Sequence, residues 1–150
     1  RMPRMMKVNE KEVENAGYSY NSSVNPTFLP GIYNNLKVPR TYFNEGSVLQ
    51  IPASVSPGFR IPLFWLSFHN FPLGLFKKLA KDVLKKDQYL NVYFHPWEFA
   101  DIKDEKFKLP GFTTKNTGKA MVDRFDEFLT YLNKTNYNFG TFQEFQKSIR

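Results

Sequence analysis

The segment from Leu90 to Phe99, which reads LNVYFHPWEF, constrains the fold more than any other part of the sequence. Its β-forming residues alternate, so that Val92 and Phe94 face one side of an extended chain while Tyr93 and His95 face the other. Proline has no backbone N–H, and Pro96 therefore ends a central strand. We predict a buried strand whose last side chain, His95, lies at its C-terminal tip.

The C-terminal tips of parallel strands carry the functional groups of many α/β folds. Histidine is suited to proton transfer near neutral pH, and the rings of Tyr93 and Trp97 could form the walls of a pocket around it. A histidine at a strand end can also be a hydrogen-bonded structural residue. The pattern alone leaves both interpretations of His95 open.

Composition narrows the class of protein. A chain of 150 residues predicts one domain, and 41% hydrophobic with 17% aromatic residues excludes a disordered segment. The net charge of +7 is compatible with an acidic partner such as nucleic acid, an anionic polysaccharide or a membrane surface. However, the basic residues mostly alternate with acidic ones and form no dense run, which indicates mainly a solvated surface and favours no nucleic acid as partner.

Two absences in the sequence exclude further classes. The chain has no cysteine, so disulfides and thiolate metal sites are impossible. No apolar run reaches the roughly 18 residues of a transmembrane helix, so we predict no membrane span.

The N-terminal part predicts short elements separated by long loops. Asn9 and Glu12 form an N-cap pair for a helix over residues 10–16, which Gly17 ends. Short strands are expected over residues 17–23 and 47–52, and the prolines and glycines of residues 25–46 predict a long shaped loop. Residues 53–72 read as an irregular aromatic segment, either a pocket lip that includes Trp65 or a loop fixed by its own apolar side chains.

The C-terminal part predicts three helices. Apolar residues recur at helical spacing over residues 75–84, which indicates a helix that packs on the sheet before the His95 strand. A second helix is expected over residues 118–133, capped by Asn116 or Thr117, followed by a short edge strand over residues 136–139. Thr141 with Glu144 forms a capping box for a last helix, which ends near residue 148.

Several motifs in this order resemble those of a known enzyme family. They are Arg1-x-Pro3, Gly17-Tyr18-x-Tyr20-x-Ser22-Ser23, Val48-Leu49-Gln50-Ile51-Pro52-x-Ser54, Tyr93-Phe94-His95-Pro96-Trp97-Glu98 and Thr141-Phe142-x-Glu144-Phe145. Together they resemble the polysaccharide deacetylases of carbohydrate esterase family four, which carry the chitooligosaccharide-deacetylase homology domain. The resemblance runs the length of the chain and is strongest for the bacterial branch with the His-Pro-Trp-Glu tetrapeptide.

The resemblance implies a fold, a reaction and a set of site residues. The fold would be α/β, the C-terminal half of a distorted (β/α)₇ TIM-like barrel, and the reaction would be metal-dependent hydrolysis of N-acetyl groups on the amino sugars of a polysaccharide. His95 would be the catalytic acid, and Arg1 would orient the base carboxylate. The backbone N–H of Arg4 would bind the oxyanion. The expected substrate contacts are Pro3, Trp65, Tyr93 and Trp97.

The sequence also departs from that family. The Asp-Asp and His-x-x-x-His motifs that hold the divalent metal, with zinc expected, lie upstream of Arg-x-Pro in the family and have no counterpart here, where the histidines are His69 and His95. Ile51-Pro52-Ala53-Ser54 replaces the family's Asp-x-x-Asp-Trp motif, and Tyr93 replaces an aliphatic residue. We therefore expect no metal to be bound by this chain alone, no turnover by the isolated chain, and a missing N-terminal segment of the same domain as its partner.

Two functions follow from the sequence. The first is one half of a polysaccharide deacetylase, with a polysaccharide or oligosaccharide as substrate. The second is a non-catalytic module that binds a glycan or a nucleic acid through aromatic loops and a basic surface. The salt dependence of binding distinguishes the two ligands of such a module, because phosphate contacts weaken steeply as salt increases whereas sugar stacking on tryptophan does not.

Overall fold

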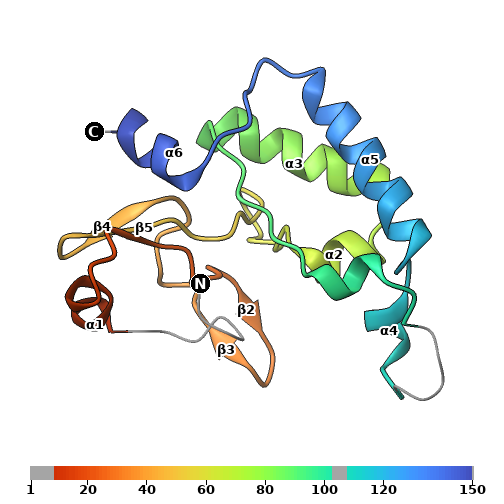
Figure 1. Cartoon of the computed structure of the whole chain (residues 1–150), viewed down its shortest axis with the longest axis horizontal. Helices are drawn as coiled ribbons and strands as arrows, with labels where there is room; N and C mark the ends of the chain where they lie inside the picture. The colour runs from red at the N-terminus through yellow and green to blue at the C-terminus, as the bar shows by residue number, and fades with distance from the viewer. Residues whose placement is uncertain (1–8, 103–107, 150) are drawn as a thin grey trace. The chain divides into compact units, whose positions relative to one another are not determined.

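The computed structural model describes residues 9–102 and 108–149, which form a mixed helix-and-strand structure (Figure 1). The chain divides into two compact units. Unit 1 extends to Pro62 and resumes at Asn138, and unit 2 runs from Leu63 to Tyr137. The sheets are small, and the described residues close no barrel. Helices and strands are thus both present, as expected, while the half-barrel stays a prediction.

The sheet of unit 1 has three short strands in the order β1-β5-β4, of which β4 and β5 are labelled in Figure 1. β1 (Tyr20–Asn21) pairs in parallel with β5 (Val48–Gln50), and β4 (Phe43–Glu45) pairs with β5 in the antiparallel sense. All three residues of β5 are buried, as expected for the central strand of a sheet that is covered on both faces. The predicted strands within residues 17–23 and 47–52 are confirmed.

A separate hairpin lies in the region predicted to be a loop. It consists of β2 (Phe28–Leu29) and β3 (Tyr33–Asn34), with Gly31 at a φ of 75° in the turn. The prediction of a long loop over residues 25–46 was therefore wrong in part. The prolines and glycines limit each strand to two or three residues but do not prevent pairing, because they lie between the strands.

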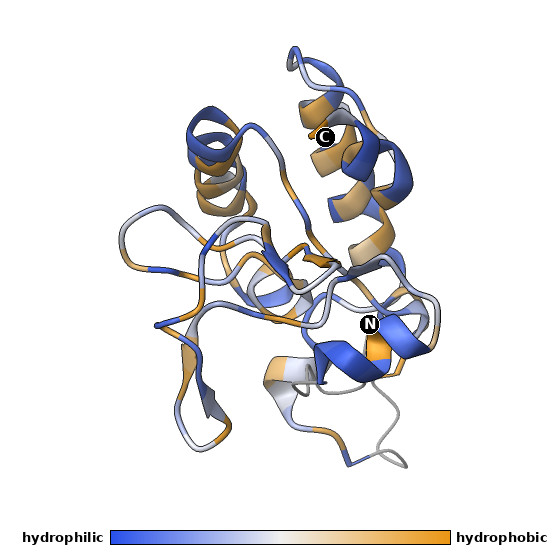
Figure 2. Ribbon diagram, turned by 90° about the vertical axis from the view of Figure 1, so that its left-hand side faces the viewer, coloured by the Kyte–Doolittle hydropathy of each residue, from blue (hydrophilic) through white to orange (hydrophobic). Residues whose placement is uncertain are grey.

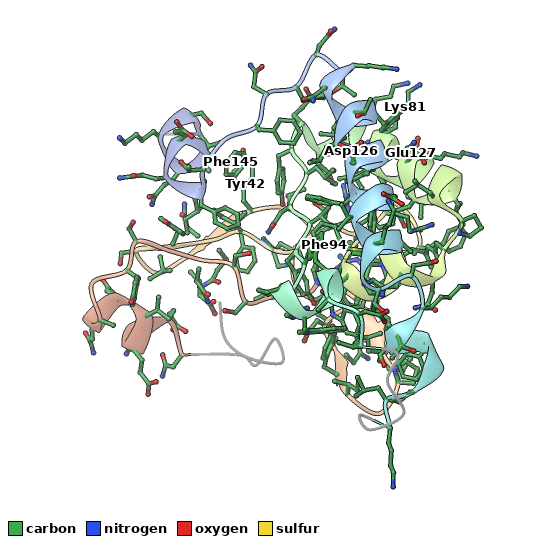
Figure 3. The ribbon with its side chains drawn as sticks, turned by 45° about the vertical axis from the view of Figure 1, so that its right-hand side comes forward. Tyr42, Lys81, Phe94, Asp126, Glu127 and Phe145 are labelled. Carbon is green, nitrogen blue, oxygen red and sulfur yellow. The ribbon has the colours of Figure 1, made fainter. Side chains whose placement is uncertain are left out.

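Helices α1 and α6 complete unit 1. α1 (Glu10–Asn15) begins where the Asn9 side chain accepts the N–H of Lys11, at 3.0 Å, as the capping pattern predicts. α6 (Phe142–Ser148) follows the predicted capping box. It packs through Phe145, whose ring centroid is 5.5 Å from that of Tyr42 (Figure 3). Residues 136–139 form no strand, so that prediction is wrong.

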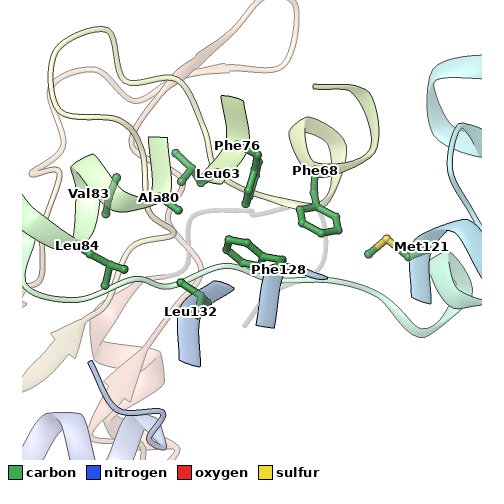
Figure 4. Packing of buried hydrophobic residues seen from close by; sticks show 9 residues of the cluster. All are labelled: Leu63, Phe68, Phe76, Ala80, Val83, Leu84, Met121, Phe128 and Leu132. Atoms are coloured by element: carbon green, nitrogen blue, oxygen red, sulfur yellow. The ribbon is translucent and has the colours of Figure 1, made fainter. Parts of the chain in front are cut away.

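Unit 2 is built from helices around an apolar core. Its elements are α2 (Trp65–Asn70), α3 (Leu73–Asp87), the 3₁₀ helix η2 (Pro96–Phe99), α4 (Gly111–Thr114) and α5 (Lys119–Asn133). The buried core consists of Leu63, Phe68, Phe76, Ala80, Val83, Leu84, Met121, Phe128 and Leu132 (Figure 4). Both long helices are amphipathic, and colouring by hydropathy separates apolar from polar faces along the helices (Figure 2).

The contacts of these helices correct two predictions. Within unit 2, whose described residues include no strand, the apolar face of α3 packs against α5 and α2: Phe76 of α3 meets Phe68 of α2 and Phe128 of α5 at centroid distances of 5.0 and 5.3 Å. Part of the segment predicted to be irregular, residues 53–72, forms α2, which places Trp65 on a helix. None of the helices in the described ranges is both long and apolar enough to cross a bilayer.

The start of α5 also differs from the prediction. Neither Asn116 nor Thr117 caps it, because Gly118, at a φ of 64°, is the residue that precedes the helix. The Asn116 side chain donates instead to the backbone oxygen of His69 at 2.6 Å, and the Thr117 hydroxyl donates to that of Thr114 at 3.0 Å.

The segment that precedes His95 is extended but is not assigned to a strand, so the predicted strand is wrong. Its alternation is nevertheless confirmed. Leu90, Val92 and Phe94 pack against the core of unit 2, while the rings of Tyr93 and His95 lie together with centroids 5.7 Å apart. Helices of unit 2 thus cover the apolar face of this segment, and this packing directs the His95 side chain to the opposite side.

Candidate functional site

A chain of three ionisable side chains lies in unit 2. Glu98 and His69 have side chains that are 0% exposed, whereas that of His95 is 40% exposed. One carboxylate oxygen of Glu98, Oε1, lies 2.7 Å from Nδ1 of His95, and the other, Oε2, lies 3.0 Å from Nε2 of His69. The buried carboxylate therefore joins an accessible histidine to a buried one.

The sequence after His95 explains this geometry locally. Pro96 occupies the first turn of η2, where its missing N–H costs nothing. Glu98, at the third position, folds back so that Oε1 accepts the backbone N–H of His95 at 2.6 Å. This is the acidic half of a capping box. The same oxygen lies next to the His95 ring, so one turn of 3₁₀ helix fixes both backbone and side chain of this residue.

Neighbouring elements hold His69 on the other side of Glu98. Its Nδ1 lies 2.7 Å from the backbone oxygen of Lys115, between α4 and α5. Arg124 of α5 donates through Nη2 to the carbonyls of Phe68 and Phe71 at 2.7 and 2.9 Å, which fixes the C-terminal end of α2. Burial lowers the pKa of the Arg124 guanidinium, while nearby Glu127 acts in the opposite sense.

Three aromatic side chains surround His95. Trp97 stacks on its ring, with centroids 5.6 Å apart and an angle of 18° between the planes. Trp65 meets the His95 ring edge-on at 5.6 Å, and Tyr93 does so at 5.7 Å. The two tryptophans also contact each other at 5.3 Å. Flat, amphipathic rings of this kind are typical of small-molecule sites.

The hydrogen-bond partners define which atoms carry protons. A carbonyl oxygen only accepts, so Nδ1 of His69 must be protonated to bond Lys115. Oε1 of Glu98 accepts the backbone N–H of His95. As a carboxylate oxygen it can accept a second hydrogen bond, which Nδ1–H of His95 donates. This assigns the His95 proton to Nδ1 and leaves Nε2 as the ring nitrogen that Glu98 does not contact.

The cluster does not fit a metal ion. Within residues 9–102 and 108–149 there is no group of three or more His, Asp or Glu side chains that could hold one. The two histidines approach different oxygens of the carboxylate at hydrogen-bond distances, and a backbone N–H also points at Oε1. The three side chains are therefore joined by hydrogen bonds to the Glu98 carboxylate.

The structure brings together all four of the predicted site residues that it describes. His95, Tyr93, Trp97 and Trp65 form one cluster, although Trp65 is distant in sequence. The other predicted positions, Arg1, Pro3 and Arg4, lie outside the described residues.

Sequence reasoning assigned no role to Glu98 or His69. The three-residue spacing of His95 and Glu98 around Pro96 was a readable signal of a back-folded carboxylate. No comparable signal existed for His69, because its contact with Glu98 spans 29 positions.

The chain matches the model of a known protein family. The family described as "Domain of unknown function (DUF3473)" matches residues 22–147, which is most of the chain. The chain belongs to this DUF3473 family. The matched region of this DUF3473 domain includes His69, His95 and Glu98. No match was found among the curated proteins or among the solved structures.

Proposed function

We propose that this DUF3473 domain supplies the C-terminal half of a polysaccharide deacetylase site, with His95 as the acid that protonates the departing amine. The observation that carries the proposal is the His95 ring itself, which is 40% exposed, held by a buried carboxylate and enclosed by three aromatic rings. The motif resemblance supplies the substrate class, the N-acetylated amino sugars of a glycan. In this proposal the chain contributes half of a distorted (β/α)₇ barrel.

The proton route follows from the hydrogen bonds. A base carboxylate from outside this sequence, as the motif resemblance implies, takes one proton from water while the water oxygen adds to the acetyl carbon. The bond between that carbon and nitrogen then breaks, and the nitrogen keeps the electron pair. His95 enters this step with a proton on each ring nitrogen and gives the Nε2 proton to that nitrogen, so the products are acetate and a free amino sugar. Since Nδ1–H stays bonded to Glu98, the ring reverts to one defined neutral tautomer. Ligands for the divalent metal would come from outside this sequence.

The aromatic rings supply the sugar contact. Trp97 has 36% of its surface exposed although it stacks on His95, so part of it remains open to a ligand. Sugar rings stack on tryptophan faces, and such a contact would hold the acetamido group beside the imidazole. Tyr93 and Trp65 would then border the acetyl group.

The direct test measures acetate release from an oligosaccharide of N-acetylglucosamine. The enzyme is a polypeptide in which this chain is joined to the segment that carries the metal ligands. We expect His95→Ala to lower kcat by roughly 10²- to 10⁴-fold, the usual contribution of a general acid. A matched control, Glu127→Gln on the exposed surface, should leave the rate unchanged. Wild-type turnover by the His95 variant would refute the assignment.

A second measurement tests binding by the chain alone and separates the enzyme from a non-catalytic module. The protein has two tryptophans, Trp65 and Trp97, and both contact His95. Their fluorescence therefore reports on this cluster only. Binding of the oligosaccharide should change the emission, and Trp97→Phe should reduce the change. Binding together with no acetate release from the joined polypeptide would favour a glycan-binding module, and a steep loss of binding with salt would indicate an anionic ligand.

A further inference from the structure

His69 is a buried titratable group that the proposed reaction does not use. Its side chain is 0% exposed, yet both ring nitrogens have partners. Nδ1 faces the Lys115 carbonyl at 2.7 Å, and Nε2 faces Oε2 of Glu98 at 3.0 Å. A buried imidazole needs hydrogen-bond partners, and here one of the two partners is the carboxylate that also contacts His95.

The acceptors around this ring set its protonation. Lys115 requires a proton on Nδ1 of His69, because its carbonyl cannot donate. The opposite nitrogen faces a carboxylate whose other oxygen already receives the backbone N–H and the Nδ1–H of His95. With Glu98 as a carboxylate, the arrangement is satisfied when His69 carries protons on both nitrogens. The buried pair is then neutral overall, which suits a site without water contact.

We propose that His69 is a positioning residue for His95 and acts through Glu98. By holding Oε2, His69 fixes the direction of the carboxylate, so that Oε1 stays against Nδ1 of His95 and keeps the proton there. Nε2 is then the only atom of His95 that exchanges a proton with substrate.

The catalytic meaning of this inference rests on the proposed function, but its proton positions can be measured without substrate. In ¹⁵N-detected NMR of the protein, the two tautomers of a neutral imidazole give different nitrogen shifts. We expect His69 to show protons on both nitrogens and His95 to show the Nδ1–H form when neutral. A His69 with a bare Nε2, or a His95 with its proton on Nε2, would overturn the inference.

Two substitutions of His69 separate positioning from packing. Glutamine places an N–H near the Nε2 position and can still donate to Glu98, whereas asparagine reaches only the Nδ1 position and the Lys115 carbonyl. We expect His69→Gln to preserve the Nδ1–H form of His95 and His69→Asn to produce a mixture of tautomers. An unchanged His95 spectrum in both variants, with wild-type folding, would contradict the proposal. If neither variant folds, the wild-type spectrum still decides.

The activity readout distinguishes this inference from the proposed function. In the joined polypeptide we expect His69→Asn to lower kcat by up to about 100-fold with little change in KM, because a misdirected ring loses rate and not binding. His69→Gln should recover most of that loss. If the wild type releases no acetate while the NMR expectations hold, the proposed reaction fails and the positioning role stands. If instead the wild type and both His69 variants release acetate at the same rate, the proposed reaction stands and the positioning role of His69 is refuted.

Discussion

Substitution of Glu98 by alanine is the most informative perturbation of the site. The change removes the acceptor of three N–H groups, namely Nε2–H of His69 and both the backbone N–H and Nδ1–H of His95. A buried donor left without a partner costs about 1–3 kcal/mol, and loss of one member of a buried ion pair costs about 3–5 kcal/mol. We therefore expect unit 2 to lose about 3–5 kcal/mol of unfolding free energy.

Urea denaturation followed by tryptophan fluorescence measures this loss, because Trp65 and Trp97 both lie in unit 2. With a slope of about 1 kcal/mol per molar urea, a loss of 3 kcal/mol lowers the midpoint by about 3 M. Glu98→Gln keeps the shape and can donate an amide N–H to a neutral His69, so it should cost only about 1 kcal/mol.

A second carboxylate provides the matched control. Glu127 pairs with Lys77 at 2.7 Å, but its side chain is 64% exposed, so Glu127→Ala should change stability by less than about 1 kcal/mol. If Glu98→Ala and Glu127→Ala shift the midpoint equally, the buried carboxylate does not organise the two histidines, and the reasoning about proton positions fails with it.

Three further substitutions test the two units separately. Phe128→Ala removes a side chain that is 2% exposed in the core and should destabilise unit 2 by about 3–5 kcal/mol in the same urea assay. Gly118→Ala should also lower that midpoint, because its φ of 64° disfavours other residues and a Cβ would lie 3.3 Å from Cα of Asp101. In unit 1, Thr141→Ala should raise amide exchange across α6, since the N-cap is worth about 1 kcal/mol. The Thr141 backbone N–H lowers the pKa of Glu144. The stability that the Glu144 carboxylate gives to α6 is therefore present above its unfolded pKa and is lost as pH falls through the lower folded pKa. Amide exchange of α6 measured against pH should show this loss.

Local signals in the sequence predicted the elements whose causes are local. The cap at Asn9, the capping box at Thr141 and the apolar stripe of α5 each depend on residues within one or two turns, and all three are present. Alternation likewise placed Phe94 and His95 on opposite sides of an extended segment.

The failures have causes that are distant in sequence. Residues 90–95 have a strand pattern and are not assigned to a strand, and their apolar face is buried by helices of unit 2 that lie far from them in sequence. Asn116 is a good N-cap residue, yet its side chain donates to the His69 carbonyl, 47 positions away, and the helix starts after Gly118. A competing long-range hydrogen bond of this kind cannot be read from local propensity.

In the tetrapeptide from His95 to Glu98, one residue, Glu98, both caps the 3₁₀ turn and holds the imidazole ring of His95. A 3₁₀ turn needs an acceptor for its first free N–H, and a carboxylate at the third position provides it. An acceptor that reaches the backbone N–H of His95 lies within 2.7 Å of Nδ1 of the same residue, so capping the turn also fixes the imidazole tautomer. The carboxylate is buried in the process, and its second oxygen then requires a donor from elsewhere in unit 2. His69, held on α2 by the loop after α4, satisfies that requirement, which links the helical core to the exposed ring.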